Sequence, residues 1–301
     1  MDLLLALAGF GVGVVVGLTG MGGGALMTPL LVLGFGVPPL AAVSSDLVAS
    51  AVMKPFGGWV HHRRGTVNWS LVRWLCLGSI PAAFLGVLLT RLVSNEDGVD
   101  RLVRTALGIA LILAAAGLIA KAYSGRNRPI TTVPIRVRPV PTVLLGALGG
   151  LVVGLTSVGS GSLIIVILLA LYPTLRPGDL VGTDLVQAVP LVAAAALGHL
   201  FFGDLHLDVA AAIVLGSVPG VLLGARLSSR APGGVVRAAL VVVLVASATK
   251  LLGAPNGVTL VAAVAALAVA LPTLARRRPP SPPMEGRLVA AQGLGGRPSS
   301  E

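Results

Sequence analysis

The chain is short of charged residues, aromatic residues and cysteine. Of its 301 residues, 11% are charged and 4% are aromatic, whereas 55% are apolar and the mean hydropathy is +0.95. Soluble domains carry about 25% charged residues, so this composition excludes a water-soluble globule. The single cysteine, Cys76, excludes an intrachain disulfide. The composition predicts a multi-pass membrane protein.

Acidic residues are few as well. Lys and Arg number 22 against 11 Asp and Glu, which gives a formal net charge of +11. In a soluble protein this excess would suggest a nucleic-acid partner. In a membrane protein, basic loops instead record orientation, since they gather on the cytoplasmic side. We therefore expect no nucleic-acid partner.

Long apolar runs fill most of the chain. They match the roughly 20 residues that a membrane-spanning helix needs, and the alternation typical of a β-barrel is not visible. The runs lie at about 3–34, 40–60, 70–90, 101–121, 143–171, 180–199, 208–226, 235–252 and 258–274. The sequence predicts an all-α polytopic membrane protein.

Two of the runs, 3–34 and 143–171, are interrupted by glycine at GLTGMGGG (17–24) and GLTSVGSG (154–161). Each could cross as a kinked helix or enter and return as a re-entrant hairpin. With two crossings, the basic residues divide almost evenly between the two sides. With two hairpins, one side keeps only Arg91, Arg101, Arg104 and Lys250. The positive-inside rule therefore favours hairpins, with seven full crossings and a cytoplasmic C-terminus.

The two interrupted segments begin an internal repeat. Gly9, Gly13 and Gly17 recur as Gly146, Gly150 and Gly154, and one residue later in register Ser45-Asp46-Leu47-Val48 matches Thr183-Asp184-Leu185-Val186. Each unit holds one hairpin and three crossings, and this odd number makes the second copy inverted. Inverted repeats build the two alternating faces of many secondary transporters, and paired glycine-interrupted segments mark the binding site.

This pattern divides the chain into two repeats and three further parts. Repeat 1 covers 1–121 and repeat 2 covers 141–253. A basic cytoplasmic linker at 122–140 joins them, an extra transmembrane helix occupies 254–275, and a disordered cytoplasmic tail covers 276–301.

Several stretches carry a family resemblance. They are the N-terminal glycine cluster followed by Pro29, PPLAAVSSDL (38–47), HHRRGTVNW (61–69), LGSIPAAFLG (77–86) and their echoes in the second half. Together they resemble the TauE/SafE family, the sulfite exporter or toluene sulfonate uptake permease family, over about 5–252. The resemblance implies a small membrane permease that moves anions such as sulfite or sulfonates, driven by the proton-motive force.

The glycine breaks are the first candidate site. A half-helix that begins inside the membrane points its positive N-terminal end at the gap, which suits a compact oxyanion. The residues expected to bind substrate there are Thr19, Gly22, Gly23, Gly24, Thr156, Gly159, Ser160 and Gly161. The alternative is close helix packing. We favour packing for Gly9, Gly13, Gly17 and their copies, and a substrate site for the breaks.

Lys54 stands inside an apolar run, directly before Pro55. A charge at the bilayer centre costs about 2.5–3.5 kcal/mol on insertion scales, so such a residue usually has a function. We expect Lys54 to be the countercharge for an anion. The alternatives are a structural ion pair with Asp46 or Asp184, or snorkelling to the membrane surface.

Asp46 and Asp184 are equivalent in the repeat and follow hydroxyl residues near the expected helix starts. They either cap their helices or act as protonatable coupling groups. Gln187, one turn after Asp184, is a further candidate substrate contact.

His61 and His199 also match across the repeat and are candidate proton-relay residues, because histidine titrates near neutral pH. The simpler interpretation of the His61-His62-Arg63-Arg64 run is an interfacial anchor. Ligand spacing typical of a metal site is absent, as is any catalytic triad or carboxylate pair, so we expect neither an enzyme nor a cofactor.

The sequence thus predicts a secondary transporter that exports a small anion, sulfite or an organosulfur compound, with proton coupling. It would lie in the bacterial plasma (inner) membrane. Its expected partners are the anionic substrate and the lipid bilayer, with a homo-oligomer left open. The alternatives are a non-transporting scaffold or assembly protein, and an anion channel.

Overall fold

The chain forms a bundle of helices. A computed structural model describes residues 3–19, 22–63, 65–93, 95–124, 137–175, 177–202, 204–227 and 233–274. The elements are α1 (Leu3–Thr19), α2 (Gly24–Gly34), α3 (Pro39–Arg63), α4 (Trp69–Arg91), α5 (Glu96–Ser124), α6 (Pro139–Thr156), α7 (Leu163–Leu171), α8 (Pro177–Phe202), α9 (Leu207–Leu227), α10 (Gly233–Leu251) and α11 (Asn256–Leu274). No strand occurs in these ranges, so the all-α prediction is confirmed for them. Most of the expected linker and the whole expected tail lie outside the described residues.

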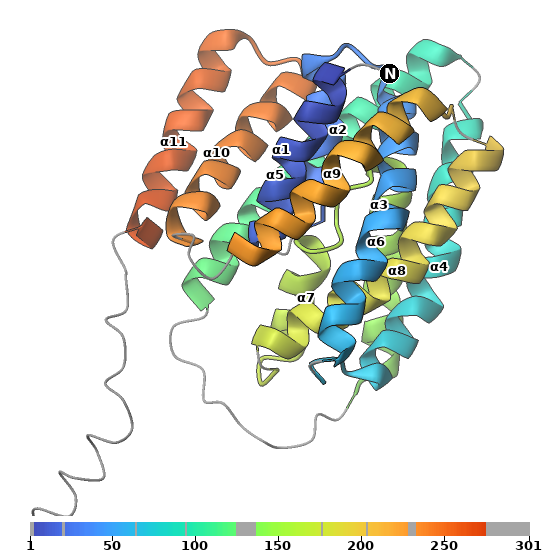
Figure 1. Ribbon diagram of the computed structural model, residues 1–301, viewed down its shortest axis with the longest axis vertical. Helices are drawn as coiled ribbons and strands as arrows, with labels where there is room; N and C mark the ends of the chain where they lie inside the picture. The colour runs from blue at the N-terminus through green and yellow to red at the C-terminus, as the bar shows by residue number, and fades with distance from the viewer. Residues whose placement is uncertain are drawn as a thin grey trace, which may run out of the picture.

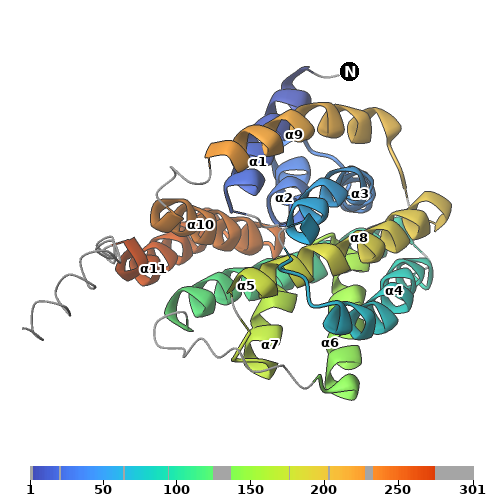
Figure 2. The ribbon, with the colours of Figure 1, turned by 60° about the horizontal axis from the view of Figure 1, so that its bottom comes forward.

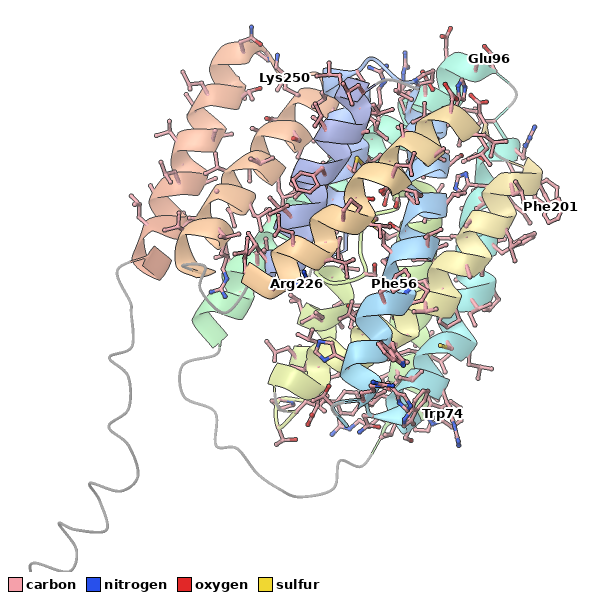
Figure 3. All side chains as sticks on the ribbon, in the orientation of Figure 1. Phe56, Trp74, Glu96, Phe201, Arg226 and Lys250 are labelled. Carbon is pink, nitrogen blue, oxygen red and sulfur yellow. The ribbon has the colours of Figure 1, made fainter. Side chains whose placement is uncertain are left out.

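Six helices are long and apolar enough to cross a membrane. They are α4, α5, α6, α8, α9 and α10. The α1, α2 and α11 helices are apolar but shorter. The α3 helix has 25 residues but is not among the six. We attribute this to Asp46, Lys54 and the serines, which lower its hydropathy. Large apolar side chains cover the outside of the bundle, including Leu77, Leu85 and Phe201, as a lipid-facing surface requires (Figure 3).

Both interrupted segments are broken into two helices at their glycine clusters. The first break separates Thr19 from Gly24, and the second separates Thr156 from Leu163. In the second break, Gly159 and Gly161 have φ angles of 140° and 90°. Residues with side chains rarely adopt such angles, so glycine allows the chain to turn there.

The glycines of α1 and of its repeat equivalent α6 pack against helices from the other half of the chain. An added Cβ at Gly13 would lie 2.5 Å from the Ser217 carbonyl oxygen, and one at Gly150 would overlap the Ser79 carbonyl oxygen. Thus α1 lies along α9, and its repeat equivalent α6 lies along α4, with the helices running parallel in each pair (Figures 1 and 2). The close-packing prediction for these glycines is confirmed.

At the centre, α3 packs against α8, its repeat equivalent. Ser44 near the start of α3 contacts His199 near the end of α8, whereas Gly58 faces Val186 in the first half of α8. The two helices therefore run antiparallel. The α10 and α11 helices lie side by side at one flank of the bundle (Figure 1).

Candidate functional site

The two glycine breaks meet inside the bundle. An added Cβ at Gly24 would overlap the Ser157 carbonyl oxygen, and one at Gly22 would lie 3.0 Å from the Ser160 carbonyl oxygen. Residues 22–24 therefore pack directly on residues 157–160, although more than 130 residues separate them in sequence. The fold thus brings together two segments that the sequence identified separately.

Lys54 reaches this junction from α3. Its side chain is only 7% exposed, and its Nζ donates a hydrogen bond of 2.6 Å to Ser160 Oγ. An ammonium has three N–H donors, and Ser160 is the sole acceptor for them among the described residues. Asp46 and Asp184 both lie within electrostatic range of Lys54. No direct ion pair joins Lys54 to Asp46 in the described chain.

Asp46 is fully buried on α3, about two turns before Lys54. Its Oδ2 accepts hydrogen bonds from Ser157 Oγ at 2.5 Å and from Thr28 Oγ1 at 3.1 Å. Ser157 belongs to the second break and Thr28 to α2, so one carboxylate joins both interrupted segments. Its Oδ1 has no hydrogen-bond partner among the described residues.

The position of Asp46 along α3 bears on whether its carboxylate caps the start of that helix. The α3 helix begins at Pro39, one residue before the expected start at 40, so Asp46 lies seven residues inside the helix. Asp184 lies at the matching interior position of α8, which begins at Pro177. From there neither carboxylate reaches the N–H groups of its own first turn. Asp46 lies instead beside the start of α2, where an added Cβ at Gly23 would be 3.9 Å from Oδ1.

The start of α2 therefore already faces a negative charge from the chain itself. A carboxylate is favourable at the positive N-terminal end of a helix. A substrate anion bound at this end of α2 would therefore lie beside the negative charge of Asp46.

On α8, Asp184 and Gln187 are buried, at 1% and 0% exposure. The Gln187 Nε2 donates to Ser79 Oγ on α4 at 2.8 Å, while its Oε1 has no partner in the described part of the chain. Gln187 is thus joined to α4, and its side chain makes no hydrogen bond to the described residues of the two breaks.

The hydroxyls of Thr19 and Thr156 form hydrogen bonds within the helices that these residues end. Thr19 Oγ1 donates to the Val15 carbonyl at 2.8 Å, and Thr156 Oγ1 donates to the Val152 carbonyl at 2.6 Å. Their hydroxyl protons are therefore directed back along α1 and α6. The hydroxyls that do contact a charged group at the junction belong to Thr28, Ser157 and Ser160, and the first two were not among the residues expected from the sequence.

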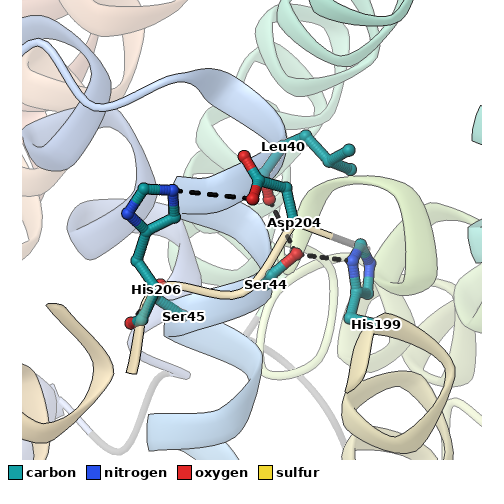
Figure 4. A network of polar contacts seen from close by, with 6 residues as sticks. All are labelled: Leu40, Ser44, Ser45, His199, Asp204 and His206. Carbon is teal, nitrogen blue, oxygen red and sulfur yellow. Dashed lines mark hydrogen bonds and ion pairs between the residues drawn. The ribbon is translucent and has the colours of Figure 1, made fainter. Parts of the chain in front are cut away.

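The two repeat-equivalent histidines differ in their surroundings. His199 is fully buried; its Nε2 donates to the Gly154 carbonyl and its Nδ1 contacts Ser44 Oγ, both at 2.8 Å. Figure 4 shows this contact, with the exposed Asp204–His206 ion pair beside it. His61 lies at the end of α3 and contacts Thr66 Oγ1 at 2.9 Å. His199 thus joins α8, α3 and α6, whereas His61 belongs to a helix end.

Tryptophan and arginine surround the end of α3 at which His61 lies. The Arg63 guanidinium lies 4.0 Å from the centroid of the Trp59 ring, and the rings of His62 and Trp69 meet edge to face. Tryptophan and basic residues gather at membrane interfaces.

The helical fold and the buried polar junction are those of a polytopic membrane transporter. The chain belongs to the family described as "Sulfite exporter TauE/SafE", whose pattern it matches over residues 5–251. This agrees with the resemblance found in the sequence. No solved structure matches the chain.

Relatives with the same general assignment are found in Bacillus subtilis (strain 168). "Probable membrane transporter protein YjnA" is 39% identical over 234 residues, which cover 76% of this chain and 91% of the relative. "Probable membrane transporter protein YdhB" is 26% identical over 242 residues, which cover 79% of this chain and 95% of the relative. These names give no substrate, so the substrate must be inferred from the site.

Proposed function

We propose that this protein is a secondary transporter that exports a small anion, sulfite or an organosulfur compound such as a sulfonate, with proton coupling. The observation that carries the proposal is the hydrogen bond from Lys54 to Ser160. It places a buried ammonium, which retains donors for an anion, at the point where the two breaks meet. A charge is retained at such depth when it serves a substrate pathway.

The proposal includes an inverted repeat. It is supported by the antiparallel packing of α3 on α8, because these helices are equivalent in sequence. It is also supported by the exchange of partners, in which α1 packs on α9 and its equivalent α6 packs on α4. Two such halves could rock about the junction and open it to either side in turn.

The orientation follows from charge. Glu96 and Lys250 lie at one end of the bundle, and Trp74 lies at the opposite end with the Arg63–Trp59 contact nearby in sequence (Figure 3). We assign the end of Trp74 to the cytoplasm of a bacterial inner membrane, since Arg63 and Arg73 belong to it. In this topology α11 is an additional crossing and the C-terminus is cytoplasmic.

We assign the proton-coupling role to Asp46 and, by the repeat, to Asp184. The Asp46 carboxylate accepts hydrogen bonds from hydroxyl groups of both interrupted segments. A proton on this carboxylate would weaken both hydrogen bonds, because charge-assisted bonds are roughly twice as strong as neutral ones. Protonation would thereby loosen the junction, which links a proton to the movement of the halves.

The test is transport in proteoliposomes containing the purified full chain. We expect sulfite or a small sulfonate to move, and an imposed pH gradient to change the flux. Lys54→Ala should lower the flux at least tenfold while the variant still folds, and Lys250→Ala, a change at a helix end, is the control. Flux that ignores the pH gradient would indicate a channel. Absence of flux for every anion would indicate a non-transporting membrane component.

A further inference from the structure

Two groups at the junction have unused hydrogen-bonding capacity of opposite kinds. The Lys54 ammonium retains two N–H donors beyond its bond to Ser160. The Asp46 Oδ1 is an acceptor without a partner among the described residues, and Asp46 is 0% exposed. Buried polar groups are nearly always hydrogen-bonded, so a ligand or water is expected to complete both.

These two groups face consecutive residues of the first break. An added Cβ at Gly22 would lie 3.6 Å from Lys54 Cε, and one at Gly23 would lie 3.9 Å from Asp46 Oδ1. Neighbouring residues lie 3.8 Å apart along the chain, so a single small molecule can reach both groups. The surroundings of Gly23 are not crowded, since its added Cβ would meet no atom closer than 3.6 Å.

We infer that the substrate carries both an acid group, which accepts from Lys54, and a hydroxyl or amino group, which donates to Asp46 Oδ1. The substrate class is then a small hydroxy- or amino-substituted acid. This inference rests on the proposed function and narrows its substrate.

A fully deprotonated oxyanion without such a donor fits the site poorly. It presents only acceptor oxygens, which satisfy Lys54 but leave Asp46 Oδ1 unpaired and repel its charge. A site built to hydrogen-bond a substrate group discriminates strongly against the analogue that lacks the group, because a buried polar atom is then left unpaired.

The test compares matched pairs of acids that differ only in the donor. The full chain in detergent is titrated by calorimetry with 2-hydroxyethanesulfonate against ethanesulfonate, and with lactate against propionate. We expect the hydroxy acid of at least one pair to bind about 10- to 100-fold more tightly, as expected for a hydrogen bond to a charged group. Equal binding within both pairs would overturn the inference and leave the proposed function standing. If none of these acids binds while sulfite is transported in proteoliposomes, the inference is overturned and the proposed function stands. If neither these acids nor sulfite is bound or transported, the proposed function itself fails.

Asp46→Asn gives a second test, because this change should act against the preference for the hydroxy acid. The amide oxygen can still accept from Ser157 and Thr28, while its NH₂ replaces Oδ1 and presents a donor to the site. The preference for the hydroxy acid should therefore disappear or reverse. The matched control is Asp204→Asn, since Asp204 is an exposed carboxylate paired with His206. An unchanged preference in Asp46→Asn, or the same change in Asp204→Asn, would contradict the assignment of Oδ1.

Discussion

The Ser157 hydroxyl donates to the Asp46 carboxylate at 2.5 Å, across 111 residues of sequence. This bond ties the second glycine break to α3, and Asp46 is tied in turn to α2 through Thr28. One carboxylate of the first half of the chain therefore holds interrupted segments of both halves. The stability of the junction should depend on this contact.

Ser157→Ala removes that contact and should lower the free energy of unfolding by about 1.5–3 kcal/mol, since a buried hydrogen bond to a charge is lost. The thermal midpoint in detergent, measured by intrinsic fluorescence, should fall accordingly. Ser217→Ala is the control because the Ser217 hydroxyl donates to the Ile213 carbonyl of its own helix, at 2.6 Å, and to no other acceptor among the described residues. Equal midpoints for the two variants would show that the Ser157 contact contributes little.

The packing of α1 on α9 gives a second prediction. Gly13→Ala would place a methyl group 2.5 Å from the Ser217 carbonyl oxygen and should destabilise the protein by about 1–3 kcal/mol through overpacking. Gly11→Ala, on the same helix, has nothing within 4 Å of the added Cβ. It should be neutral or stabilising, because alanine favours helix over glycine.

The same thermal scan distinguishes the two glycine variants. A loss of stability in Gly11→Ala equal to that in Gly13→Ala would mean that α1 tolerates no change at all, and the close approach to α9 would not be the cause.

The sequence was sufficient to predict the helical class, the glycine breaks and the special position of Lys54. These features are local: a charge in an apolar run and a glycine cluster in a helix are visible without contacts. The repeat also placed equivalent residues in register, and this explains why Gly13 with Ser217 and Gly150 with Ser79 make corresponding contacts.

The partners of the charged residues could not be predicted in this way. Thr28 and Ser157 contact Asp46 only because three separate segments converge, and a single sequence carries no signal of that convergence. For Thr19 and Thr156 substrate binding stays a prediction; in the structure each hydroxyl bonds the carbonyl four residues earlier, as a threonine at a helix end can. A threonine that faces a substrate and one that bonds its own helix look the same in sequence.

The histidines give a third prediction, since equivalent positions should respond differently. His199→Leu removes the donor to the Gly154 carbonyl in a fully buried position and should cost about 1–3 kcal/mol of stability. His61→Leu, at the end of α3, should change stability by about 0.5 kcal/mol or less. If both variants lose transport and neither loses stability, the predicted difference between the two histidines is wrong and a proton-relay role for both is favoured.

Gln187 and Ser79 allow a test of whether their hydrogen bond is structural. Ser79→Ala leaves the buried Gln187 amide with neither end paired and should destabilise the protein by about 1–3 kcal/mol. Adding Gln187→Leu removes the unpaired amide, so the double variant should be less destabilised than the sum of the two single changes. A coupling of about 0.5–1.5 kcal/mol in this cycle would assign the pair to the α4–α8 contact. If the single changes are additive and Gln187→Leu alone abolishes substrate binding, Gln187 acts on the substrate, as the sequence first suggested.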